Sequence, residues 1–454
     1  MIVMKFGGTS VEDAAAMRQV IEIVRRKRAL SPIVVASAMA KITDTLIRCA
    51  QLAHQGHEDD AQRLLNETVA ARHRDAAAQL VTTEPQRSVL LERIDHHLNE
   101  LRTLLHGLAI LGELSPRSLD TVASYGERLS TLILAAAMRE AGLDAELLDA
   151  RQFIITDDRF TKATPLMDLS APRARALLLP VLHRGAIPVT QGFIGATPHG
   201  ITTTLGRGGS DYSAAIIGAL LDADAIEIWT DVDGILTTDP KLVPHARLLE
   251  SVTFQEAAEL AYFGAKVLHP STILPAVEKN IPVYVYNTKN PKSPGTRITA
   301  REAQPTPPGT LKAIAYKQGI TVINIYSTRM LLAHGFLHAI FEVFDRFETS
   351  VDLLATSEVS VSLTIDDTRH LDKIVSELQK FSTVTVERER AIICLVGEGM
   401  KHTPGIAARA FGAIRDININ MISQGASEIN LSFIVHEADV PTVIQRLHRE
   451  FFER

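Results

Sequence analysis

Hydrophobic residues along the first 290 positions follow two alternating periods. Short β-rich runs occur at Ile2–Met4, Pro32–Ala36, Ile187–Thr190, Ala225–Trp229 and Pro282–Tyr286. Between such runs apolar residues recur at helical spacing, as at Met17, Val20, Ile21 and Val24, which share one helix face. Strands that alternate with helices predict an α/β fold with a mainly parallel sheet sandwiched by helices. Such sheets bind ligands beyond the carboxyl ends of their strands.

Residues 52 to 112 have a different pattern, rich in Ala, Leu, Gln, His and Arg with little glycine, and they predict helices. Six histidines in this stretch suggest a metal site, but their spacing gives no paired ligands with carboxylates. We therefore interpret them as residues of solvated helix faces. They are His54, His57, His73, His96, His97 and His106.

A proline-rich segment at 303–309 predicts a domain boundary, and the chain beyond it repeats. SVDLLATSEVSVSLTI from Ser350 matches NINMISQGASEINLSFIV from Asn418. Helical patterns precede the copies near 335–347 and 405–415, and follow them near 368–380 and 438–452. The pattern predicts two βαββαβ units side by side, although chance similarity of two hydrophobic hairpins is the alternative. The expected domains are 1–300, 311–385 and 386–454.

Composition excludes several classes of protein. Hydrophobic residues make up 46% of the 454 residues, which favours globular domains over disorder. The net charge of −6 gives no indication of a nucleic-acid surface, and no 18-residue apolar stretch predicts a membrane span. Two distant cysteines, Cys49 and Cys394, form neither a disulfide framework nor a metal motif. With no signal-peptide pattern at the N-terminus, we expect a cytoplasmic protein.

The first candidate site is the segment MIVMKFGGTS, in which Lys5 ends an apolar run just before Gly7 and Gly8. A strand-to-helix turn of this composition can cradle phosphate with its backbone N–H groups. A tight turn with a lysine stem lying along apolar surface is the structural alternative.

A second candidate is GRGGSD at 206–211, followed by the start of a helix. The glycines allow backbone N–H groups to approach an anion, and Ser210 is a candidate N-cap. Arg207 can hold a carboxylate with two hydrogen bonds. An arginine and Asp211 inside a glycine-rich loop favour a functional site over a simple helix cap.

Three further stretches carry polar residues at predicted element ends. WTDVDGILTTDPK from Trp229 follows a strand, and acidic turns are its structural explanation. ASYGER from Ala123 places Glu127 in the first turn of a helix, where a glutamate also suits the helix dipole. GAKVLHP from Gly264 contains Lys266, which on its own reads as a surface lysine.

Taken together, KFGGTS, ASYGERLS, TLGRGGSDYSAA, WTDVDGILTTDP and FGAKVLHP resemble, in order, the motifs of the amino-acid kinase superfamily. The resemblance is greater to the aspartate kinases and spans nearly the whole chain. The two C-terminal repeats resemble the paired ferredoxin-like α+β ACT domains of those enzymes. No dehydrogenase motif follows them, so a monofunctional kinase is expected.

The resemblance implies ATP-dependent phosphorylation of the β-carboxylate of L-aspartate, with Mg²⁺ held mainly by phosphates and water rather than by a protein metal motif. Phosphoryl transfer needs positioning and charge neutralisation more than covalent chemistry. The implied catalytic residues are Lys5, Asp211 and Arg207. For the substrate, the resemblance assigns Arg207 to the α-carboxylate, Glu127 to the α-ammonium and Thr43 to a hydroxyl contact. For the nucleotide it assigns Lys5, Gly7, Gly8, Thr230, Asp231, Lys241 and Lys266. Leu236 and Lys241 depart from the usual aromatic and arginine, which affects nucleotide packing.

ACT pairs of this family bind an end-product amino acid and form a dimer contact, so a homodimer or tetramer is expected. The segments from Met330 and Ser350 resemble the lysine-inhibited branch, with threonine as the alternative effector. The implied effector residues are Met330, Ser350, Val351, Asp352, Ser357 and Glu358. The structural alternative is that the charges of Asp352 and Glu358 lie in solvent at a hairpin end.

Two other functions remain open from the sequence. Another member of the superfamily could act on glutamate, acetylglutamate, carbamate or UMP, but tandem ACT repeats and the Glu127 motif count against it. A non-catalytic amino-acid sensor could retain the fold, but intact Lys5 and Asp211 count against that. A Walker-A nucleotide site is excluded because its lysine follows the glycines, whereas Lys5 precedes them.

Overall fold

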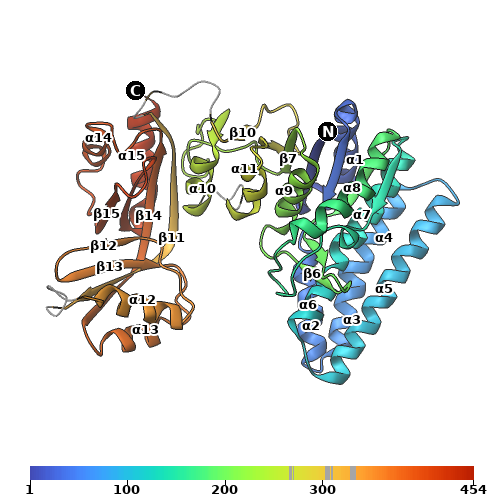
Figure 1. Ribbon diagram of the computed structural model, residues 1–454, viewed down its shortest axis with the longest axis horizontal. Helices are drawn as coiled ribbons and strands as arrows, with labels where there is room; N and C mark the ends of the chain where they lie inside the picture. The colour runs from blue at the N-terminus through green and yellow to red at the C-terminus, as the bar shows by residue number, and fades with distance from the viewer. Residues whose placement is uncertain (265–267, 269, 302–306, 308–309, 328–333, 454) are drawn as a thin grey trace. The chain divides into compact units, whose positions relative to one another are not determined.

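The computed structural model describes residues 1–264, 268, 270–301, 307, 310–327 and 334–453 (Figure 1). This part of the chain forms two compact units. The first contains residues 1–235 and 250–254 with the described residues between 268 and 300. The second contains residues 236–249 and 255–264 with the described residues from 301 to 453.

An eight-stranded sheet organises the first unit, with the strand order β3-β4-β2-β1-β7-β9-β10-β8. The strands from β3 to β9 in this order pair in parallel, and β10 is antiparallel to β9. The predicted mainly parallel sheet is therefore confirmed. The bounds are β1 Ile2–Phe6, β2 Pro32–Ala36, β3 Ala145–Leu148, β4 Ile187–Gln191, β7 Ala225–Thr230, β8 Ser251–Thr253, β9 Val283–Asn287 and β10 Thr296–Thr299.

Helices cover both faces of this sheet. Helices α1 and α7 pack on one face, and α8 and α9 pack on the other, while α2, α4 and α5 lie outside α7. A short hairpin of β5 and β6 stands beside the sheet. The bounds are α1 Ala14–Lys27, α2 Ile42–His54, α3 Glu58–Leu64, α4 Ala71–Leu80, α5 Gln86–Leu111, α6 Pro116–Ala123, α7 Tyr125–Glu140, β5 Ile194–Ala196, α8 Met167–His183, β6 Thr202–Thr204, α9 Gly209–Leu221 and α11 Leu274–Glu278.

Local sequence signals fix several helix ends. Asp13 caps α1 by accepting a hydrogen bond from the Ala16 N–H at 2.8 Å. The apolar face of α1, from Met17 to Val24, is buried. Ser115 caps α6, with Pro116 at the first helical position. Gly112 ends α5 in the left-handed conformation, with φ of 62°.

The stretch predicted to be helical between 52 and 112 is helical, but one interpretation of its histidines is wrong. His73 is completely buried, and its Nδ1 lies 2.6 Å from the Val69 carbonyl oxygen. Burial lowers the pKa of His73 to about 4, so this ring is neutral and belongs to the core. The prediction failed because it treated this helix as a surface helix. In the structure, α5 and α7 pack against α4 and cover the side that carries His73.

The second unit is built on a six-stranded sheet with the order β12-β13-β11-β14-β16-β15. All of its pairs are antiparallel. The bounds are α10 Phe254–Tyr262, β11 Leu311–Tyr326, α12 Phe336–Arg346, β12 Leu354–Thr356, β13 Ser360–Ile365, α13 Leu371–Leu378, β14 Thr383–Gly397, α14 Ile406–Ala413, β15 Met421–Gln424, β16 Asn430–His436 and α15 Val440–Phe452.

The two repeats predicted from the sequence join in one six-stranded sheet through β11 and β14. β11 and β14 run the length of the sheet, and β14 crosses the expected boundary at 385/386. One apolar cluster gathers Ile340, Phe344 and Leu363, and another gathers Phe433 and Leu447. Each repeat therefore keeps its own core while the two long strands connect them.

The segment 236–249 belongs to the second unit, although the motif that begins at Trp229 is continuous in sequence. Val243 is buried in the cluster that contains Leu447. The Ile314 N–H donates to the Thr237 carbonyl oxygen at 2.8 Å. Among the described residues, none of the helices is both long and apolar enough to cross a membrane.

Candidate active site

Lys5 and Asp211 form an ion pair at the carboxyl end of the central strand. Lys5 belongs to β1 and Asp211 to the first turn of α9, and Lys5 Nζ lies 2.6 Å from Asp211 Oδ1. Both side chains are nearly buried, with 11% and 13% of their surface exposed. The parallel pairing of β1 with β2 and β7 brings Lys5 to the sheet edge where ligands of such folds bind.

A cavity of about 450 Å³ opens beside this pair within the first unit. The size suits a small metabolite. The cavity brings together Lys5, Asp211, Arg207, Glu127 and Thr43, which the sequence analysis had singled out separately. Its other lining residues are Ser37, Ile47, Leu119, Asp120, Ala123, Thr161, Phe193, Thr204, Gly206, Gly208, Gly209 and Ser210.

The glycine-rich loop before α9 forms one wall of the cavity. Gly206 and Gly208 have φ of 78° and 69°, in the left-handed region that favours glycine. Gly208, not Ser210, is the N-cap of α9, so that part of the prediction is wrong. The left-handed glycine starts the helix two residues earlier than a serine cap would. Arg207 lies exposed between the two glycines.

Glu127 is a buried carboxyl group without a charged partner among the described residues. It lies in the first turn of α7 and is 3% exposed. Its Oε1 accepts a hydrogen bond from the Ala38 N–H at 3.1 Å, while Oε2 has no partner in the described structure. Burial raises the pKa of Glu127 to about 8. A cation that entered the cavity would stabilise the ionised form of this group.

Asp120 is a structural member of the site that the sequence analysis missed. Its carboxylate accepts hydrogen bonds from Thr204 N and Oγ1 and from Thr161 N, at 2.7–2.9 Å. Burial raises the pKa of Asp120, although these hydrogen bonds oppose the shift. The group thus ties α6 to β6 and to the loop at Thr161. Its partners lie 41 and 84 positions further along the chain, so no local pattern pointed to it.

The two glycines after Lys5 have different surroundings. The Gly7 N–H donates to the Trp229 carbonyl oxygen at 3.0 Å, so it already has an acceptor. A Cβ atom on Gly8 would lie 3.1 Å from the Ala38 carbonyl oxygen. The close approach of the Ala38 backbone therefore explains why position 8 is a glycine. Both amides remain proposed phosphate donors, although that of Gly7 already donates to Trp229.

The other nucleotide residues expected from the sequence lie in separate parts of the structure. Thr230 ends β7, which pairs with β1, and the exposed Asp231 follows it; Thr230 Oγ1 lies 3.3 Å from Asp231 Oδ1. Lys241 is exposed in the second unit, where its N–H donates to Asp239 Oδ1 at 2.9 Å. Lys266 lies outside the described residues.

The expected effector segment lies in the second unit, and Asp352 is not a charge in solvent. Its side chain is 3% exposed, and its Oδ1 lies 3.0 Å from Lys317 Nζ and 2.5 Å from the Tyr262 hydroxyl. Lys317 Nζ also contacts Asp366 at 2.8 Å. Burial lowers the pKa of Lys317, but hydrogen bonds with Asp366 and Asp352 raise it by more, so the overall shift is upward.

The remaining effector residues surround this cluster in sequence but differ in burial. Ser357 and Glu358 are exposed in the turn between β12 and β13, where the Ser357 N–H donates to the Ser360 carbonyl oxygen at 2.8 Å. Ser350 is exposed and Val351 is half-buried. Met330 lies outside the described residues.

Comparison with known proteins gives matches over nearly the whole chain. The model of the amino acid kinase family matches residues 1–287, and a model of an ACT domain matches residues 393–451. Lysine-sensitive aspartokinase 3 of Escherichia coli is 39% identical over 100% of this chain and 99% of its own length. Chloroplastic aspartokinase 1 of Arabidopsis thaliana is 41% identical over 99% of this chain and 80% of its own.

Solved structures agree with this result. A crystal structure of E. coli aspartokinase III in complex with aspartate and ADP, in the R-state, has a TM-score of 0.85 at 38% identity and covers both chains completely. A T-state structure of the same enzyme with lysine and aspartate has a TM-score of 0.84 at 38% identity, covering 100% of this chain and 99% of the other.

Proposed function

Because this chain belongs to the aspartokinase family, we propose that it transfers the γ-phosphoryl group of ATP to the β-carboxylate of L-aspartate. The product is 4-phospho-L-aspartate. The observation that carries the proposal is the single cavity that holds the Lys5–Asp211 pair, Arg207 and Glu127 together. The similarity to an enzyme whose crystal structure contains aspartate and ADP supports the same substrate pair here.

Glu127 and Arg207 are proposed to bind the two charged groups on the α-carbon of aspartate. The α-ammonium would meet the free Oε2 of Glu127, and this contact would bring the pKa of Glu127 down from about 8, so that the bound form is ionised. Arg207 would hold the α-carboxylate with two hydrogen bonds. Thr43 lines the same cavity and can add a hydroxyl contact. These contacts leave the β-carboxylate as the reacting group.

The β-carboxylate is already a nucleophile, so no general base is required. Its oxygen attacks the γ-phosphorus, the bond to the β,γ-bridging oxygen breaks, and ADP leaves with the electron pair. Lys5 is proposed to neutralise charge on the transferring phosphoryl group. Asp211 orients the Lys5 ammonium through the 2.6 Å contact.

ATP is proposed to lie along Gly7, Gly8, Thr230 and Asp231, with Lys241 and Lys266 also assigned to the nucleotide. Mg²⁺ would supply charge neutralisation on the phosphates, held mainly by phosphate oxygens and water. The donor set fits this view, because Asp211 and Asp120 are engaged with Lys5 and with Thr204 and Thr161.

Feedback inhibition by lysine at the ACT repeats is the proposed regulation, with threonine as the alternative effector. The T-state complex of the E. coli relative with lysine supports this choice. Residues 350–358 are the proposed effector segment. A homodimer through the ACT repeats, or a tetramer built from it, is proposed as the assembly. A cytoplasmic location fits two cysteines that are buried and free.

The test is a hydroxamate assay for acyl phosphate with MgATP and either L-aspartate, L-glutamate or no acceptor. We expect signal with aspartate alone, and suppression of that signal by L-lysine but not by L-threonine. Suppression by threonine alone would reassign the effector. Signal with glutamate, or no signal from folded protein, would overturn the proposed reaction.

A further inference from the structure

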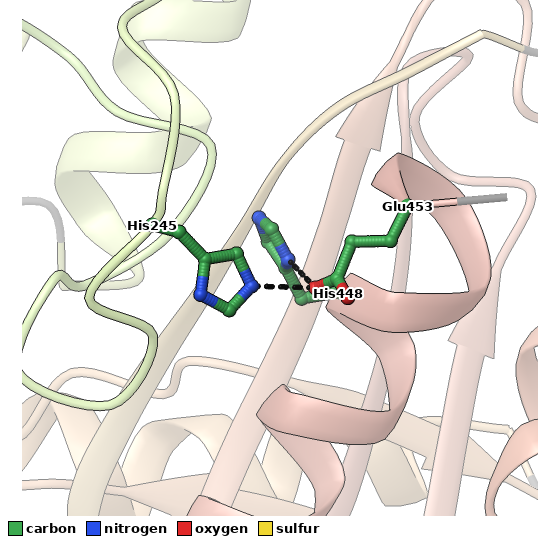
Figure 2. Close-up of side chains that lie close together, drawn as sticks. All are labelled: His245, His448 and Glu453. Carbon is green, nitrogen blue, oxygen red and sulfur yellow. Dashed lines mark hydrogen bonds and ion pairs between the residues drawn. The ribbon is translucent and has the colours of Figure 1, made fainter.

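Three potential metal ligands meet in the second unit, and none of the three has a role in the proposed catalytic or effector sites. They are His245, His448 and Glu453, and their ligand atoms all lie within 4.8 Å of one another (Figure 2). Glu453 Oε1 lies 2.7 Å from His245 Nε2 and 3.0 Å from His448 Nδ1. One carboxylate oxygen thus faces a ring nitrogen of each imidazole.

The position of His448 is fixed by packing. It lies on α15 with 1% of its side chain exposed, against the ring of Phe452 at 4.8 Å between centroids. Its Nε2 lies 3.1 Å from Thr237 Oγ1. A hydrogen bond donated from Nε2–H to Thr237 leaves the lone pair of Nδ1 directed at Glu453, as an outer hydrogen bond does for histidine ligands of metals.

The other two groups can adjust around this fixed ring. The side chain of His245 is 64% exposed and that of Glu453 is 33% exposed. Metal bonds of about 2.0–2.2 Å in a tetrahedral site separate ligand atoms by about 3.3 Å. The observed separations of 2.7 and 3.0 Å between Glu453 Oε1 and the two ring nitrogens therefore need to widen only slightly when an ion enters the cluster.

The charges favour a cation as well. Glu453 supplies a carboxylate oxygen that faces a ring nitrogen of each of the two histidines. Two imidazoles and one carboxylate form a donor set that zinc and its neighbours prefer, whereas Mg²⁺ prefers oxygen ligands.

We propose that His245, His448 and Glu453 bind one divalent transition-metal ion, with Zn²⁺ the best fit and water in the fourth position. The ion would link the segment 236–249 to the end of α15. Its nitrogen and carboxylate ligands differ from the phosphate oxygens and water proposed to hold the Mg²⁺ of ATP. The simpler alternative is a hydrogen-bonded clamp that binds no metal, and the experiment below distinguishes the two.

The test is a titration of the full chain with Co²⁺, without nucleotide, monitored by the visible absorption of four-coordinate cobalt. We expect one Co²⁺ per chain with absorption bands that excess Zn²⁺ removes and excess Mg²⁺ does not. His245→Ala should weaken binding about tenfold or more. This variant is chosen because His245 is exposed, whereas replacement of buried His448 could prevent folding.

His402→Ala is the matched control. His402 is exposed in the same unit, 3.8 Å from Glu428, and this contact contains no second histidine. The control should bind Co²⁺ as the unmodified chain does. Zn²⁺ should also raise the melting temperature of the unmodified chain and of His402→Ala, but not of His245→Ala. No cobalt bands, or equal binding by His245→Ala, would overturn the proposal in favour of the clamp.

Discussion

Glu127 and the Lys5–Asp211 pair line one cavity, but their charges are compensated differently. Lys5 and Asp211 neutralise each other at 2.6 Å, which keeps a cation at the sheet edge. Among the described residues, the Glu127 carboxyl group accepts one hydrogen bond, from the Ala38 N–H, and its other oxygen has no partner. A buried carboxyl with an unpaired oxygen, beside a compensated ion pair, is suited to a substrate that brings its own ammonium group.

Lys5→Met should lower kcat by about 10²-fold to 10³-fold, the usual effect of removing one group that stabilises transition-state charge. Steady-state kinetics with aspartate and MgATP measure this. Lys279→Met is the control, because within the described part of the chain the Lys279 ammonium makes only an exposed ion pair with Asp222, at 3.1 Å. Retention of full kcat in Lys5→Met would remove Lys5 from the reaction.

Glu127→Gln should raise the KM for aspartate about 10-fold to 100-fold, because a hydrogen bond to a charged group contributes about 1.5–3 kcal/mol. The KM for ATP should change little. Equal increases in both KM values would instead indicate a general distortion of the cavity.

The pKa of Glu127 also predicts a pH effect on the unliganded protein. Its folded pKa of about 8 lies above its ordinary value of 4.5, so the folded state retains the proton more tightly. The stability from this group is full below pH 4.5 and is lost as pH rises through about 8. Glu127→Gln should therefore gain stability relative to the unmodified chain between pH 5 and pH 9. Parallel melting curves at all pH values would contradict the assignment.

At the scale of elements, periodicity predicted the strands β1, β2, β4, β7 and β9 nearly to their ends. The helices α12 to α15 were also expected where they lie, because amphipathic patterns report local structure. The pairing of strands that are distant in the sequence was harder to predict from these patterns. The sharing of β11 and β14 by both repeats depends on long-range pairing that no local pattern specifies, and so does the burial of His73.

The start of α9 offers a test of the loop geometry. Gly206 has φ of 78°, and a Cβ atom there would lie 3.1 Å from the Thr161 carbonyl oxygen. Gly206→Ala should destabilise the protein by about 1–2 kcal/mol and raise the KM for aspartate. Gly107→Ala, inside α5 with nothing within 4 Å, should instead be neutral or stabilising by up to about 1 kcal/mol in urea unfolding. Equal effects of Gly206→Ala and Gly107→Ala on stability would contradict the requirement for a left-handed glycine in the loop before α9.

At the scale of the whole molecule, the motifs located Lys5, Arg207, Asp211 and Glu127, and the fold brought them to one cavity. Asp120 was missed because its partners, Thr161 and Thr204, follow it by 41 and 84 positions. The cluster at Glu453 was missed for the same reason, since His245 lies 208 positions away. Residues that act as a local motif were accessible from sequence, whereas residues joined only by folding were not.

The proposed lysine inhibition would act from the second unit on catalysis in the first. Asp352→Ala should raise the lysine concentration for half-inhibition about tenfold or more while kcat stays unchanged, since allosteric couplings are commonly 1–3 kcal/mol. Asp345→Ala, at an exposed position of α12, is the matched control. Lysine should inhibit this variant at the same concentration as it inhibits the unmodified chain. Inhibition curves for the three proteins measure this, and an unchanged curve for Asp352→Ala would remove that residue from the effector site.

The most direct test of the central claim is to observe which carboxylate receives the phosphoryl group. L-Aspartate labelled with ¹³C at C4 is incubated with MgATP and the enzyme, and the product is followed by ¹³C and ³¹P NMR. The proposed reaction predicts an ATP-dependent acyl phosphate whose phosphorus couples to the labelled C4. A product without that coupling, or no ATP-dependent product, would contradict phosphorylation of the β-carboxylate by this chain.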